Sequence, residues 1–126
     1  MLGGTGSAVA RPGGEGTMRF LVEIDHVKTG SPLAGESARA FVESVIFPTL
    51  DRAEELVREG RIVAGGPVAG RIALRFVADA ESSEQLDRIV TSLPLWTVAE
   101  TRVTPLIEFG ERREHVRALI GRAARP

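Results

Sequence analysis

Three absences limit what this chain of 126 residues can be. It has no cysteine, which excludes disulfides, thiolate catalysis and metal sites with sulfur ligands. It has no apolar run near the roughly 20 residues that a membrane helix needs, so we expect no membrane partner. It has only two histidines, His26 and His115, which is too few for a histidine ligand set, so the sequence predicts no metal site.

The charges of the chain are nearly balanced. Sixteen basic residues face 17 acidic ones, and the sequence pI is about 6.1. A surface that holds phosphate backbones would be basic, so we expect no nucleic-acid partner. The glycine-rich segment GGPVAGR also lacks the Lys and Ser/Thr of a phosphate loop and does not lead into a helix.

The length and composition predict one folded domain with two extensions. Residues 1–17 hold six of the fourteen glycines and are expected to form a flexible leader, with Met18 as an alternative start. Their apolar cluster is too short for a signal peptide, so we expect a cytoplasmic protein. Residues 18–109 form the predicted domain, and residues 110–126 form an appended amphipathic helix.

Hydrophobic spacing gives the order of elements within the domain. It predicts a strand over 19–27, a long helix that ends at Glu59 and is kinked or divided at Pro48, and a hairpin with an irregular outer strand about Ala69 and Gly70. The long helix starts either at Ser31-Pro32 or near Glu36. A second helix, with a capping box at its start, is followed by a strand over 98–109. This order is the ferredoxin-like βαββαβ arrangement, an α+β fold with a C-terminal helix added.

Alternation along the strands assigns the two faces of the predicted sheet. Two helices cover only one face of a four-stranded antiparallel sheet, so the other face is wet or meets a partner. The apolar residues predicted for the helix side are Phe20, Val22, Ile24, Leu74, Phe76, Thr101 and Val103. The charged residues predicted for the open side are Glu23, Asp25, Arg75, Glu100 and Arg102.

From Gly60 to Leu106 the chain resembles muconolactone isomerase and its relatives in the dimeric α+β barrel superfamily. The resemblance rests on Arg58-Glu59-Gly60, on Gly70, on Asp79 and most specifically on Leu93-Pro94-Leu95-Trp96. It implies a homodimer or larger homo-oligomer in which two sheets close face to face, and a reaction without cofactor or metal. Ala64-Gly65-Gly66-Pro67 departs from the bulky aromatic and basic residues of the isomerases, so no isomerase catalytic residue is carried over.

The open-side charges are the candidates for chemistry. In a dry chamber, repulsion between Glu23 and Asp25 would favour a proton on one of them near neutral pH, giving a base for proton removal next to a carbonyl. The alternative, which we favour for the set, is that they pair with Arg75 or Arg102 across the sheet. Glu100 is a third candidate for proton transfer.

Other residues complete the predicted site. His26 is a candidate acid or base at the rim of the helix side, although a rim histidine is more often only a surface residue. Arg75 and Arg102 are expected to hold substrate oxygens or to neutralise the carboxylates. Trp96, with Phe76 or Phe47, is expected to wall the pocket, or to serve only in packing.

These residues predict a small-molecule isomerase or cyclase that works by proton transfer on an organic substrate, such as a polyketide or lactone. A composition rich in Arg, Ala, Gly and Val is typical of a high-GC genome and makes a natural-product pathway plausible. Two alternatives stay open: a cofactor-independent monooxygenase of the antibiotic-biosynthesis type, and a non-catalytic binding or assembly protein whose barrel has no cavity.

Overall fold

A computed structural model describes residues 16–27 and 35–123 of the chain. Most of the predicted leader, residues 1–15, and the possible helix start at Ser31-Pro32 lie outside the described residues. The described part contains the strands β1 Met18–His26, β2 Ile62–Pro67, β3 Ala73–Ala80 and β4 Ala99–Leu106. Its α-helices are α1 Gly35–Phe41, α2 Phe47–Arg58, α3 Ser83–Thr91 and α4 Phe109–Ala123. Two further helical segments are η1 Val42–Ile46, a π-helix, and η2 Pro94–Val98, a 3₁₀-helix.

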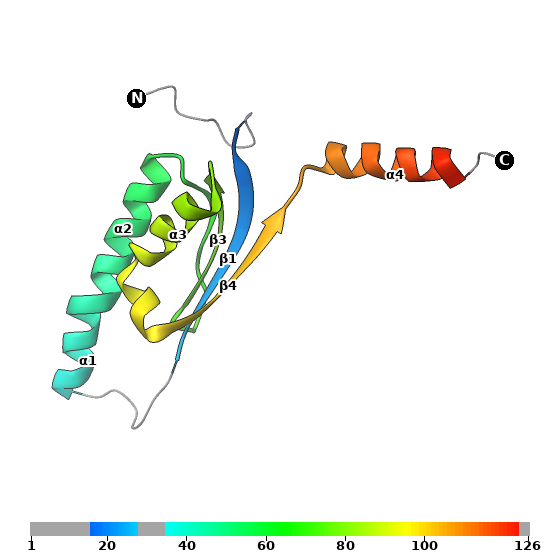
Figure 1. The fold of residues 1–126 in the computed structure, drawn as a ribbon. Helices are drawn as coiled ribbons and strands as arrows, with labels where there is room; N and C mark the ends of the chain where they lie inside the picture. The colour runs from blue at the N-terminus through cyan, green and yellow to red at the C-terminus, as the bar shows by residue number, and fades with distance from the viewer. Residues whose placement is uncertain (1–15, 28–34, 124–126) are drawn as a thin grey trace.

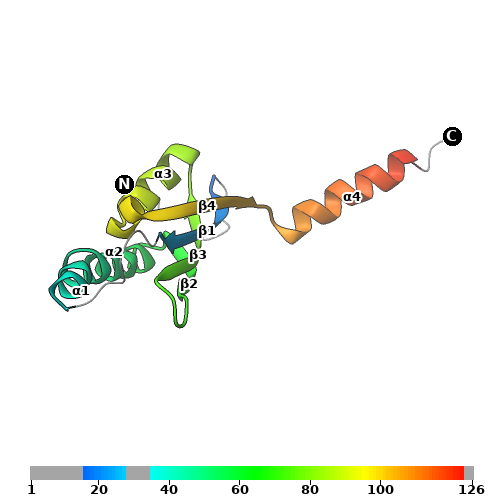
Figure 2. The same cartoon turned by 90° about the horizontal axis from the view of Figure 1, so that it is seen from below.

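The strands form one antiparallel sheet in the order β2-β3-β1-β4. The helices α1, α2 and α3 cover one face of this sheet, and no described residue covers the other face (Figure 1). The helix α4 projects away from the body, as the view from below also shows (Figure 2). The predicted α+β fold with a ferredoxin-like order and an added C-terminal helix is therefore confirmed.

The core lies between the sheet and its helices, on the face that alternation predicted. Val22 and Ile24 of β1 have no exposed surface, and Phe20 is 5% exposed. They pack with buried residues of β3, α2 and α3, among them Phe76, Leu56 and Ile89, and with Leu93 between α3 and η2. On β4 the prediction holds by register but not by burial, because Val103 lies opposite Val22 yet is 40% exposed. The helices do not extend over this edge strand.

The long first helix runs from α1 to α2 without a break, and Pro48 lies in the first turn of α2. A proline inside a helix removes one hydrogen bond and collides with the preceding turn. The π-helical segment η1 ends directly before α2. Its i→i+5 hydrogen bonds replace the regular α-helical pattern in the turn that precedes Pro48. The expected kink or division at Pro48 is thus a local change of helix type.

The ends of the other elements have identifiable causes. The Ser82 side chain caps α3 by accepting a hydrogen bond of 3.1 Å from the Gln85 backbone N–H, as the capping box predicts. The predicted strand over 98–109 is too long. It ends at Leu106, two residues pass without strand or helix structure, and Phe109 is the first residue of α4.

The outer strand β2 is irregular, as expected from its glycines. Its register against β3 shifts between Ile62 and Ala64, and Gly65 has a φ of 111°. A Cβ atom on Gly65 would lie 2.2 Å from the backbone oxygen of Arg75, so only glycine fits at this position. Gly66 has open space where its Cβ would be. The bare backbone of β2 therefore comes very close to β3.

Candidate functional site

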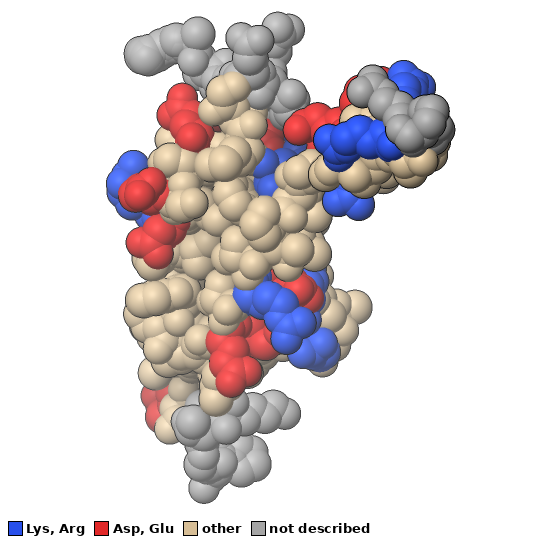
Figure 3. Space-filling view, turned by 45° about the vertical axis from the view of Figure 1, so that its right-hand side comes forward, with Lys and Arg blue, Asp and Glu red and all other residues tan. Residues whose placement is uncertain are grey.

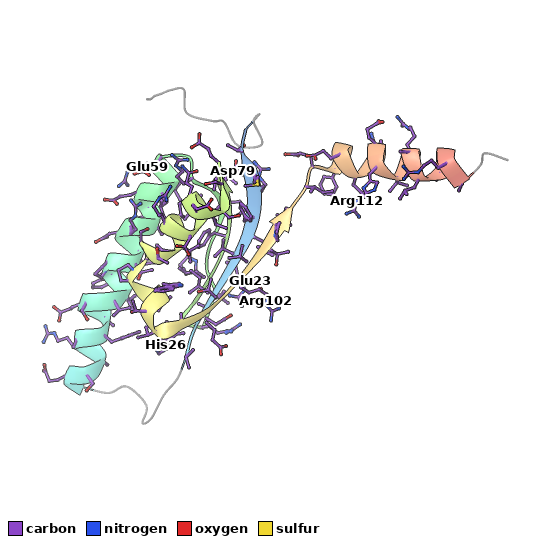
Figure 4. All side chains as sticks on the ribbon, viewed as in Figure 1. Glu23, His26, Glu59, Asp79, Arg102 and Arg112 are labelled. Carbon is purple, nitrogen blue, oxygen red and sulfur yellow. The ribbon has the colours of Figure 1, made fainter. Side chains whose placement is uncertain are left out.

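The polar cluster on the uncovered face of the sheet, formed by Glu23, Asp25, Arg71, Arg75, Glu100 and Arg102, is the candidate site. The register explains why these residues meet. Glu23 lies between Arg75 on β3 and Arg102 on β4, and Asp25 lies opposite Glu100. Residues opposite each other on neighbouring strands project from the same face. Figure 4 places Glu23 and Arg102 close together on the sheet.

Arg75 is the centre of the polar cluster. Its guanidinium Nε lies 3.4 Å from a carboxylate oxygen of Glu23, and its Nη2 donates hydrogen bonds of 3.1 and 3.2 Å to the two carboxylate oxygens of Asp25. Arg71 donates a third hydrogen bond to Asp25. Asp25 is thus held by two guanidinium groups. The favoured pairing of these carboxylates with Arg75 is observed within one chain.

The cluster surrounds a hollow with a volume of about 530 Å³, lined by Glu23, Asp25, Arg75, Glu100, Thr101 and Arg102. The side chains of Glu23 and Asp25 are 26% and 33% exposed, so they are partly sheltered although no helix of the described part of the chain covers this face. Within the described residues, neither Glu100 nor Arg102 makes an ion pair. Figure 3 shows acidic and basic side chains gathered side by side in the lower part of the body, with an uncharged surface between them and α4.

Such an arrangement supplies two kinds of group to a bound molecule. Carboxylates accept protons, and guanidinium groups stay charged and bind oxygen atoms in pairs. Glu100 and Arg102 make no ion pair with another described residue, so a molecule that binds to them breaks no existing ion pair. The cluster can therefore hold a polar oxygen and transfer a proton in the same hollow.

His26 lies apart from the cluster, on the other face of the sheet at the end of β1 (Figure 4). Its ring packs 4.9 Å, centroid to centroid, from the ring of Phe41. Its Nδ1 atom is buried, as is the hydroxyl of Thr101, and neither makes a hydrogen bond to any described residue. His26 contributes nothing to the hollow in this chain.

The three aromatic residues expected as walls are not at the hollow either. Phe76 is 4% exposed in the core on the helix side. Phe47 lies on the outer surface of the helices and is 56% exposed, beside a separate shallow groove. Trp96 is in η2 and is 42% exposed. The expectation of an aromatic wall is therefore not met within one chain, because the residues that line the hollow are polar.

Sequence reasoning missed two arginines. Arg71 precedes β3, in the turn that Gly70 makes with a φ of 76°, and the turn brings its side chain to Asp25. Ala73, two residues later, is the strand partner of Asp25, so the register is the signal that could have found it. Arg19 pairs with Asp79, its opposite residue on β3.

The Arg19–Asp79 pair occupies the other end of the same face. Arg19 donates hydrogen bonds of 2.9 and 3.1 Å to the two oxygens of Asp79, whose side chain is only 4% exposed. This hydrogen bonding raises the pKa of Arg19 above its usual value, although burial lowers it. A hollow of about 620 Å³ lies beside Arg19, lined also by Met18, Leu106 and Glu111. Because both charges are engaged, we regard the pair as structural.

No cluster of three or more His, Cys, Asp or Glu side chains in the described part of the chain could hold a metal ion. No helix in residues 16–27 and 35–123 is long and apolar enough to cross a membrane.

Comparison with known proteins agrees with the fold and with the motifs. Residues 18–112 match the model of the muconolactone delta-isomerase family. A crystal structure of muconolactone isomerase is similar, with a TM-score of 0.59 and 26% sequence identity over 72% of this chain and 90% of that one. No curated protein matches. Since the family match covers most of the chain, from β1 into α4, the chain belongs to the muconolactone delta-isomerase family of isomerases.

Proposed function

We propose that this protein is a cofactor-independent isomerase or cyclase that moves a proton next to the carbonyl group of a small organic substrate, a lactone or a polyketide. The observation that carries the proposal is the polar cluster of paired and unpaired charges around a hollow, on the face of the sheet that residues 16–27 and 35–123 leave uncovered. Membership of an isomerase family supports the reaction class. We place the reaction in the cytoplasm, as the sequence predicts.

In the proposed reaction a carboxylate of the cluster removes a proton from the carbon beside the carbonyl. The negative charge that develops on the carbonyl oxygen is stabilised by a guanidinium group, and the proton returns to another carbon of the substrate. We assign the proton transfer to Glu23, Asp25 or Glu100 and the oxygen contact to Arg75 or Arg102. The product has the same mass as the substrate, so no oxidant or reductant is needed.

We further propose that the site works in a homodimer. The hollow is open in one chain, and catalytic hydrogen bonds and ion pairs are stronger where water is excluded. A second sheet placed over the polar cluster would exclude water from it. In that setting His26 and Trp96 remain candidates only if the second copy brings them to the hollow. Phe76, in the core, and Phe47, on the outer surface of the helices, do not face it.

The test is proton exchange with solvent. Muconolactone and related unsaturated lactones are incubated with the protein in D₂O, and NMR follows both isomerisation and deuterium uptake at the carbon beside the carbonyl. We expect Glu23→Gln, Asp25→Asn or Glu100→Gln to lower turnover by about a hundredfold or more for the residue that transfers the proton. Glu84→Gln, an exposed change at the start of α3, is the matched control and should keep full turnover.

Three results would contradict the proposal. Full turnover in all three cluster variants would remove the assigned proton transfer. Oxygen consumption with a product heavier than the substrate would indicate the monooxygenase alternative instead. A panel of lactones and polyketide-like substrates without any exchange would favour the non-catalytic alternative.

A further inference from the structure

The arm helix α4 is the least explained element of the chain. None of its residues is buried, and it packs against no other helix or strand of the described chain. Phe109 is 94% exposed, Leu119 is 48% exposed and Ile120 is 64% exposed. An isolated helix of about 15 residues is marginal in water even with good helix formers. The helix therefore needs a surface to pack against.

The apolar residues of α4 share one side of the helix. At 100° per residue, they fall within one stripe, which we call the arm stripe: Phe109, Val116, Leu119, Ile120 and Ala123. Arg112 lies within the stripe and Arg113 lies at its edge, whereas Glu111 and Glu114 are on the other side. Arg117 forms an ion pair of 2.8 Å with Glu114, away from the stripe. Arg112 and Arg113 make no ion pair with any described residue, so the side that needs a partner is both apolar and positively charged.

A complementary surface exists on the outside of α1, η1 and α2. It begins with a shallow groove of about 430 Å³ lined by Ala38, Arg39, Val42, Glu43 and Phe47. Phe47 is 56% exposed there. One and two turns farther along α2, Asp51 and Glu54 point the same way as Phe47 and form no ion pair within the described residues. We call this surface, from Ala38 to Glu54, the outer helix strip.

The two surfaces agree in length as well as in charge. The arm helix of 15 residues is about 22 Å long, and the outer helix strip from Ala38 to Glu54 spans about 24 Å at the helical rise of 1.5 Å per residue. Pairing α4 with another α4 would place Arg112 and Arg113 near their own copies, which like-charge repulsion opposes. Pairing with the outer helix strip would place them near Asp51 and Glu54 instead.

The outer helix strip of the same chain is out of reach. The link between β4 and α4 is Ile107 and Glu108, and two extended residues span about 7 Å. The strip faces away from the sheet, behind a helix layer about 10 Å thick. Figures 1 and 2 show α4 leaving the end of β4 away from that layer. A surface on another molecule is therefore the one that α4 can cover.

We propose that α4 is an exchanged arm, whose stripe packs on the outer helix strip of a second copy of this chain. The exchange is reciprocal, so two copies make two equivalent contacts. This interface is separate from the uncovered sheet face and does not depend on the reaction proposed above. The contact between α4 and the outer helix strip either connects two dimers or adds to the interface within one dimer.

The absence of cysteine makes a direct test possible, because every disulfide must come from introduced residues. Two full-length variants, Phe47→Cys and Ile120→Cys, are mixed and oxidised gently, with a mass tag on one of them. We expect a mixed disulfide between the two chains. The matched control replaces Ile120→Cys with Ala118→Cys, on the opposite side of α4, and should give roughly tenfold less product, because docking raises the effective concentration of only one side.

Charge reversal provides an independent arm of the same test. Arg112→Glu with Arg113→Glu should suppress the cross-link, and so should Asp51→Arg with Glu54→Arg. Mixing chains that carry the two reversals should restore it. Three outcomes would overturn the proposal: equal cross-linking of Ile120→Cys and Ala118→Cys, a cross-link of Ile120→Cys mainly to itself, or an intramolecular disulfide in the double variant Phe47→Cys/Ile120→Cys.

Discussion

The two faces of the sheet differ in what they accomplish. One face is apolar, is covered by α1, α2 and α3, and holds the core around Val22 and Ile24. The other is polar and uncovered, with Asp25 held by Arg71 and Arg75. Ile24 and Asp25 are neighbours on one strand, yet Ile24 is buried in the core and Asp25 lies on the partly exposed polar face. Successive residues of a strand project from opposite faces, so the residues that stabilise the fold alternate with those of the proposed site. Mutations on the two faces should therefore affect stability and activity separately.

The largest expected effect is on the covered face. Ile24→Ala removes a side chain with no exposed surface from the central strand β1. We expect the free energy of unfolding to fall by about 4 kcal/mol, because transfer and cavity costs add. Chemical denaturation measures this. Glu100→Gln on the uncovered face is the control and should change it by less than about 0.5 kcal/mol; equal losses would erase the distinction between the faces.

Next in size is a glycine pair on β2. Gly65→Ala places a Cβ atom 2.2 Å from the Arg75 backbone oxygen at a φ of 111°, and we expect a loss of about 3 kcal/mol from the combined overlap and backbone strain. Gly66→Ala meets no atom within 4 Å and should be nearly neutral. Thermal unfolding of both variants compares them. Similar melting temperatures would show that β2 does not approach β3 this closely.

The polar face has one structural pair, and it gives an intermediate effect. Arg19→Ala takes the guanidinium from Asp79, which is 3% exposed, and we expect a loss of about 2 kcal/mol. Since the folded state raises the pKa of Arg19, its contribution is fully present below its usual pKa and is lost only as the pH rises through the higher folded value. Titration of Arg19 should therefore not change the stability difference between Arg19→Ala and the wild type from mildly acidic to mildly alkaline pH. Arg102→Ala, which breaks no ion pair in the described chain, should leave stability unchanged.

The smallest effect concerns a helix that covers the apolar face. Ser82→Ala removes the hydrogen bond that caps α3, and we expect a loss of about 1 kcal/mol. Ser83→Ala, the next residue and an exposed one, is the control. Denaturant midpoints should move for Ser82→Ala and stay for Ser83→Ala. A midpoint that moves for Ser83→Ala and stays for Ser82→Ala would show that Ser82 does not cap α3.

Much of the fold follows from short-range patterns in the sequence. Alternation along 19–27 placed Val22 and Ile24 in the core because burial of one face fixes the register of a strand. The capping box at Ser82 and the hairpin turn at Gly70 followed from local hydrogen bonding and backbone freedom. The end of β4 did not follow, because the apolar residues up to Phe109 continue a strand-like pattern into α4.

The candidate site was only partly predictable. Alternation along β1 correctly placed Glu23 and Asp25 on one face of the sheet. Their partners depend on the register between β1 and β3, which brings Arg71, in the turn before β3, next to Asp25. Aromatic residues were assigned to a wall by type alone. Phe47 instead lies on the outer surface, because the direction of a helical side chain depends on where the helix packs. What a second copy would add to the hollow in the proposed dimer depends on assembly, which no local sequence pattern records.

One measurement tests the central claim most directly: turnover and the free energy of unfolding, determined on the same preparation of the triple variant Glu23→Gln/Asp25→Asn/Glu100→Gln. If the uncovered face carries the chemistry, proton exchange into the lactone should fall by at least about a hundredfold while the variant still unfolds cooperatively with the wild-type secondary structure. Full proton exchange in the folded variant would contradict the account.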